Sequence, residues 1–197
     1  MFTGIVIPTG KLRRVLKRTC IVLTIIALLV FNLTLPTMAA ITIGSSTNAN
    51  SGSGFTVTIA KPAGTVAGDV LVACIVATSQ LARRAEVTSP VGWQLIRHTE
   101  ATQTWYYEML TYYKVAGVSE PSSYTWSSTE FNTSGGISRL TGVDINHVVD
   151  VSAEAQGQGD SPAAATAPSV TTNYANDIVI KVTGVAGALD LSDITIA

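Results

Sequence analysis

The chain is poor in the residues that usually build metal centres and nucleophilic active sites. It has two cysteines and two histidines in 197 residues, and 13% of its residues are charged. His98 and His147 form neither an HxH nor an HExxH pattern, so the sequence offers no zinc-ligand spacing. No Gly-x-Ser-x-Gly element marks a serine as a nucleophile. We therefore predict that the protein is not an enzyme and needs no catalytic cofactor.

The two cysteines do not make a disulfide framework. Cys20 lies in the N-terminal apolar segment, and Cys74 lies within the apolar run Val70–Ala77. A free cysteine in such a run behaves as a small hydrophobic residue. The sequence therefore predicts that Cys74 is buried and unreactive.

Acidic residues are absent from the first 39 positions, where five of the twelve basic residues lie. The other 197 − 39 = 158 residues hold all thirteen acidic and seven basic residues, so their net charge is 7 − 13 = −6. Phosphate contacts dominate nucleic-acid affinity and require clustered positive charge. This acidic segment is therefore not expected to bind nucleic acid.

The N-terminal 39 residues have the layout of a secretory signal peptide. Basic residues from Lys11 to Arg18 precede an apolar run from Cys20 to Leu35, and Thr37-Met38-Ala39 supplies small residues for cleavage. We expect a helical signal in 1–39, cleavage after Ala39, and an extracellular or periplasmic protein that does not contact the membrane after cleavage. The apolar run has sixteen residues, fewer than the roughly twenty that span a bilayer. An uncleaved N-terminal anchor is the alternative.

Residues 40–197 read as one antiparallel all-β domain, a jelly-roll-like sandwich. Short stretches rich in Val, Ile, Thr and Tyr alternate with Gly, Pro, Asn and Ser turns. The expected strands are Ile41–Ser45, Phe55–Ile59, Asp69–Ala77, Trp93–His98, Thr104–Lys114, Tyr124–Ser128, Gly136–Thr141, Ser169–Thr172 and Asp177–Gly184.

Two segments are expected to be loops, and the C-terminal end is expected to be incomplete. Asn48–Gly54 is rich in Ser, Gly and Asn, and 153–168 has the composition of a long surface connection. Gly68–Val72 is echoed by Asn176–Ile180, but the chain stops at Ala197 before a closing strand. The sequence therefore predicts a sandwich that lacks its final strand and exposes an edge.

The aromatic-rich strand Thr104–Lys114 contains the strongest candidate for a binding surface. Alternation places Tyr107, Met109 and Tyr113 on one face, which we expect to be core, and Tyr106, Glu108 and Tyr112 on the other, which we expect to face solvent. Two tyrosines flanking a carboxylate suit a carbohydrate platform. The alternative is that these tyrosines are covered by another sheet or subunit.

Carboxylates suggest two further possibilities. Asp144, Asn146 and Asp150 lie within seven residues and are weak candidates for a structural calcium site; the alternative is that they shape the turn through hydrogen bonds to the backbone. A pair of carboxylates in a cleft would permit glycoside hydrolysis, but no spacing selects a pair.

A series of short motifs resembles a group of uncharacterised bacterial secreted and phage-associated β-sandwich domains. The motifs are Gly68–Ala73, Pro90–Trp93, Tyr112–Ala116, Glu120-Pro121, Tyr124–Trp126, Gly135–Ile137 and Gly142–Asp144. The resemblance implies a non-catalytic structural or interaction module of a cell surface or appendage, with a protein partner. Carbohydrate binding, with a glycan partner, is the alternative, and glycoside hydrolysis ranks third. The sequence leaves the oligomeric state open.

Overall fold

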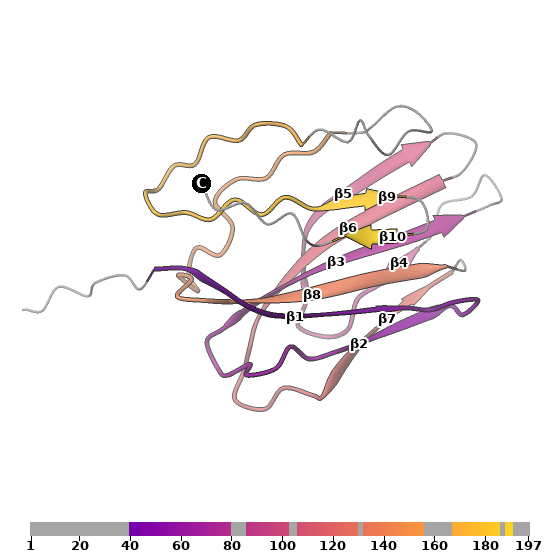
Figure 1. The fold of residues 1–197 in the computed structure, drawn as a ribbon, viewed down its shortest axis with the longest axis horizontal. Helices are drawn as coiled ribbons and strands as arrows, with labels where there is room; N and C mark the ends of the chain where they lie inside the picture. The colour runs from indigo at the N-terminus through magenta and orange to yellow at the C-terminus, as the bar shows by residue number, and fades with distance from the viewer. Residues whose placement is uncertain are drawn as a thin grey trace, which may run out of the picture. The chain divides into compact units, whose positions relative to one another are not determined.

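The secondary structure of the described residues consists of ten β-strands (Figure 1). The structure is a computed structural model that describes residues 40–79, 86–102, 106–129, 132–155, 167–185 and 188–190. The predicted signal segment, 1–39, lies outside these ranges. The strands are β1 (Thr42–Asn50), β2 (Thr56–Ala60), β3 (Val70–Ser79), β4 (Val87–Thr88), β5 (Gln94–Thr102), β6 (Tyr106–Val115), β7 (Ser123–Ser128), β8 (Thr133–Thr141), β9 (Thr183–Val185) and β10 (Ala188–Asp190).

Antiparallel pairing arranges these strands as two sheets and a short hairpin. The larger sheet has the order β1-β8-β3-β6-β5, the smaller has the order β2-β7-β4, and β9 pairs with β10. The prediction of an all-β antiparallel sandwich is confirmed.

The core lies between the two sheets and is rich in aromatic rings. Trp93 packs edge-on against Tyr124 and Trp126, with ring centroids 5.1 Å away in both cases. The buried core residues are Val57, Ile59, Leu71, Ala73, Ile75, Trp93, Leu110, Tyr112, Tyr124, Trp126 and Ile137. Because they come from β2, β3, β6, β7, β8 and the residue before β5, burial of their apolar surface holds the two sheets together.

The central strand β3 is buried on both faces. Leu71 and Ile75 face the smaller sheet, while Val70 and Cys74, on the opposite face, are also buried. On the neighbouring strand β8, β10 makes a contact that must be face-on, because both edges of β8 are already paired with β1 and β3. The apolar character of β3 on both sides agrees with its burial on both faces, and the predicted burial of Cys74 is confirmed.

Several sequence-based boundaries were wrong. The segment Asn48–Gly54 is not all loop, because β1 continues to Asn50 and pairs with β8 along its length. Ser169–Thr172 forms no strand, and of Asp177–Gly184 only Thr183 and Gly184 belong to one. The surface connection predicted over 153–168 is described only at its two ends, where 153–155 and 167–168 are exposed and irregular.

Candidate functional site

The inner and outer faces of β6, the predicted binding strand, are the reverse of those predicted from the sequence. Glu108 and Tyr112 are 2% and 4% exposed and face the smaller sheet, whereas Met109 and Tyr113 are on the outer face and partly exposed. The pairing with β3 explains the inversion, because Tyr112 lies opposite Ala73 and Glu108 opposite Ala77. Because alanine is small, Ala73 and Ala77 leave room in the interior for the larger side chains of Tyr112 and Glu108. The side chain of Tyr106 lies outside the described residues.

Tyr112 is therefore a core residue. Its ring lies 6.4 Å from that of Trp126, centroid to centroid. Burial disfavours the phenolate and raises the pKa of Tyr112 to about 12. A side chain enclosed in this way presents no face on which a sugar ring can stack.

Glu108 belongs to a cluster of ionisable groups at the β5–β6 pair. His98 Nε2 lies 3.1 Å from Glu108 Oε2 and 3.7 Å from Glu100 Oε1, and the two glutamates face each other across the strands. Like charges placed opposite each other are unfavourable, and the intervening imidazole moderates the repulsion when it is protonated. Because the Glu108 side chain is only 3% exposed, a substrate could not contact both carboxylates, which argues against glycoside hydrolysis here.

The carboxylates of the calcium candidates already accept hydrogen bonds. Asp144 Oδ1 accepts a 2.9 Å hydrogen bond from the backbone N–H of Asn146, and Asp144 Oδ2 lies 3.2 Å from His147 Nδ1. Asp150 accepts two bonds from Asn173, at 2.6 Å from the backbone N–H and 2.8 Å from Nδ2. The backbone bonds are the main reason why the pKa values of both aspartates are lowered.

The Asp144 contacts fit the turn-shaping alternative, whereas Asp150 joins its segment to Asn173, 23 residues away. No group of three or more His, Cys, Asp or Glu side chains that could hold a metal occurs in the part of the chain that the structure describes. The calcium site stays a prediction.

A hollow of about 360 Å³ lies beside the β6–β7 connection, lined in part by Pro90, Val91 and Pro121. Two oppositely charged residues, Lys114 and Glu120, are at its wall and lie 3.3 Å apart, Nζ to Oε1. Glu120 also accepts hydrogen bonds from the backbone N–H of Gly117 at 2.7 Å and from the hydroxyl of Tyr124 at 2.8 Å. Because both glutamate oxygens are already used, this arrangement fixes the turn and leaves little capacity for a ligand.

The edge strand β1 is a candidate hydrogen-bonding surface for a partner. It is the outermost strand of the larger sheet, on the side where β2 lies (Figure 1). Among the described residues, β1 pairs only with β8. No charged residue and no proline occurs in its nine residues, TIGSSTNAN. Charge and proline are two features with which proteins usually block such an edge.

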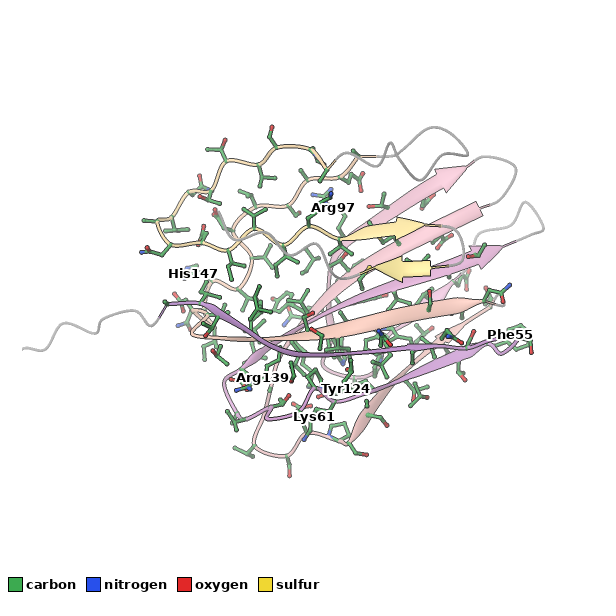
Figure 2. The ribbon with its side chains drawn as sticks, in the orientation of Figure 1. Phe55, Lys61, Arg97, Tyr124, Arg139 and His147 are labelled. Atoms are coloured by element: carbon green, nitrogen blue, oxygen red, sulfur yellow. The ribbon has the colours of Figure 1, made fainter. Side chains whose placement is uncertain are left out.

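The opposite edge of the same sheet is better protected. Strand β5 carries Arg97, His98 and Glu100, and its pairing with β6 is interrupted between Leu95 and Arg97. Arg97 also donates hydrogen bonds at 2.7 Å to the carbonyl and hydroxyl of Ser152 in the chain that follows β8 (Figure 2). Charge and a covering segment distinguish β5 from β1, since the pairing of β1 with β8 also has a register shift, between Ile43 and Ser46.

The full length of this edge strand was not predicted, because Asn48 and Asn50 were assigned to a loop. Burial alternates along β1, since Ile43, Ser45, Thr47 and Ala49 are half-buried and the residues between them are exposed, but the sequence shows no matching hydrophobic alternation. Ser45 and Thr47 use their hydroxyls to bond the carbonyls of Ala63 and Ala60, at 2.6 and 2.5 Å. Polar residues thus take the inner positions that apolar residues usually occupy in a strand.

No family model, curated protein or solved structure matches this chain. Within the described ranges, no helix is long and apolar enough to cross a membrane.

Proposed function

We propose that the protein is a secreted, non-catalytic interaction module that binds a protein partner by adding a strand to the β1 edge. The main support for this proposal is the unpaired side of β1. The strand has no charge or proline, its register with β8 is continuous from Ser46 to Asn50, and one of its two sides has no strand partner among the described residues. In strand addition, main-chain hydrogen bonds give the affinity and alternate side chains give the specificity.

The N-terminal segment supports export of the module. Its basic stretch, apolar run and small-residue cleavage site are those of a signal peptide. The resemblance to secreted and phage-associated sandwich domains points to a surface or appendage.

Carbohydrate binding through the β6 tyrosines has less support. Tyr112 is 4% exposed and Glu108 is 2% exposed, so neither can meet a sugar without a change in the core. We therefore favour a protein partner over a glycan.

The proposal is tested by site-specific photo-crosslinking in cells that produce the full chain. A photoreactive amino acid is placed at Asn48 on the β1 edge, and at Ser127 as the control. Ser127 is exposed like Asn48, but it lies on β7, the central strand of the smaller sheet, where no strand can be added. We expect protein adducts of the exported chain from position 48 only. Equal adduct yields at both positions, or none at either in a correctly exported chain, would contradict the proposal.

A further inference from the structure

The backbone groups that β1 presents to a partner can be identified from its pairing with β8. The N–H of Ser51 donates a 2.7 Å hydrogen bond to the carbonyl of Thr133, its opposite residue in the continued register. In an antiparallel pair, the residues that bond the partner strand alternate with residues that point away. Thr47 and Ala49 therefore bond β8, whereas Ser46, Asn48 and Asn50 direct their N–H and C=O groups outward.

This outward row has the spacing needed to pair with itself. We propose that β1 of a second copy occupies the edge, antiparallel, with the two-fold axis at Asn48; the proposal rests on the strand-addition function given above. Ser46 of one copy then lies opposite Asn50 of the other, and Asn48 opposite Asn48. Each of these pairs exchanges two main-chain hydrogen bonds, and the two larger sheets become one continuous sheet.

Charge does not oppose a second copy as the occupant. An isologous contact places each residue near its own equivalent, so any charge near the axis would meet the same charge. The strand from Thr42 to Asn50 contains no charged residue, so a two-fold contact at Asn48 opposes no like charges. The β5 edge would fail this condition, because Arg97, His98 and Glu100 lie along it.

The side chains near the axis also suit self-pairing. On the outer face, the exposed amide of Asn48 would lie beside its equivalent, where two amides can hydrogen-bond to each other. On the inner face, Thr47 would lie opposite Ala49 of the other copy. Ala49 is partly buried and packs against the hydrophobic core, so the pairing would extend the cover over that end of the core.

The register is tested by disulfide formation in the full chain carrying Cys20→Ser, with Cys74 buried and silent. Directly opposite, hydrogen-bonded residues have Cα atoms about 5.5 Å apart, a distance that a disulfide can span. We expect Asn48→Cys to oxidise rapidly to a covalent dimer, and Ser46→Cys to form one only when mixed with Asn50→Cys. A dimer that Ser46→Cys forms alone as fast as Asn48→Cys would overturn the register.

Sedimentation equilibrium tests the self-association itself. Asn48→Lys puts two positive charges at the axis and should weaken dimerisation by about tenfold or more, while the control Ser127→Lys should leave it unchanged. A chain that stays monomeric at every concentration refutes the pairing with a second copy.

If the chain is monomeric, hydrogen exchange of its backbone amides shows whether only self-pairing is wrong or whether strand addition at β1 is wrong as well. Fast exchange at the amides of Ser46, Asn48 and Asn50 would leave the edge open to a different protein. Slow exchange there in a monomer would mean that the edge is already covered, and both proposals would be wrong.

Discussion

Arg139 Nε donates a 2.7 Å hydrogen bond to Asp69 Oδ2, joining the end of β8 to the residue before β3. The same oxygen accepts a 2.8 Å bond from the backbone N–H of Val66. The Asp69 side chain is 7% exposed and that of Arg139 is 21% exposed, so the pair is largely removed from solvent. It ties the connection between β2 and β3 to the larger sheet.

Loss of the Asp69 carboxylate should therefore destabilise the fold. We expect Asp69→Asn to lower the free energy of unfolding by about 1.5–3 kcal/mol, the usual contribution of a hydrogen bond to a charged group. Urea denaturation measures the change. Glu86→Gln removes the same charge from an exposed residue and should change stability by about 0.5 kcal/mol or less. Equal losses in the two variants would mean that net charge, and not the Asp69–Arg139 contact, is responsible.

The neighbouring residues Tyr112 and Tyr113 provide a direct test of which face of β6 is inside. Tyr112 is buried in the core, whereas Tyr113 is partly exposed and its hydroxyl donates a 2.7 Å bond to Gln94 Oε1. Replacing a buried aromatic residue by alanine costs about 3–5 kcal/mol, so Tyr112→Ala should cost that much. Tyr113→Ala should cost about 1 kcal/mol. Thermal unfolding of the two variants is the measurement, and a larger loss in Tyr113→Ala would reverse the assignment of the faces.

The fold class could be predicted because turn residues and β-formers alternate clearly along the chain, but the direction of β6 could not. Both faces of that strand carry tyrosines, so its alternation does not identify an inner side. The decision comes from β3, where Ala73 and Ala77 make room for Tyr112 and Glu108. Each alanine lies more than thirty residues from its partner in the sequence. The two residues can be matched only when the register between β3 and β6 is known.

The C-terminal strands were misassigned for a related reason. Gly68 and Asn176 begin the two similar segments, and both adopt a left-handed conformation, with φ of 89° and 68°. The local turn is therefore repeated, as the sequence suggests. The strand is not, because Val70–Val72 pair with both β6 and β8, whereas Ile178–Ile180 form no strand. Pairing partners, and not local composition, decide whether such a segment becomes a strand.

Cys74 should be chemically silent in the folded protein. Its burial raises the pKa of the thiol to about 12, although a hydrogen bond with Thr111 acts in the opposite direction. Since the thiolate is the reactive form, we expect no reaction with a disulfide reagent until the chain carrying Cys20→Ser is unfolded in urea. Val91→Cys in the same background is the positive control, because Val91 is 97% exposed. Rapid labelling of Cys74 in the native protein would show that the β3 region opens readily.

Glu120 should make the protein sensitive to acid. Burial opposes its ionisation, but the N–H of Gly117, the hydroxyl of Tyr124 and the ammonium of Lys114 together outweigh burial and lower the pKa of Glu120. Its folded pKa is therefore below that of an unfolded glutamate, about 4.3. The carboxylate stabilises the fold above that value, and the stabilisation is lost as the pH falls through the folded pKa.

Glu120→Gln should consequently flatten the acid side of the stability curve. The variant is expected to be less stable than the wild type at pH 7, and the difference should shrink as the pH falls below about 4. Urea midpoints measured at a series of pH values follow both effects. Glu86→Gln, which removes an exposed carboxylate, should run parallel to the wild type. Because Asp144 and Asp150 also have lowered pKa values, some acid sensitivity must remain in Glu120→Gln. A pH-independent difference between Glu120→Gln and the wild type would mean that Glu120 acts through packing and not through its charge.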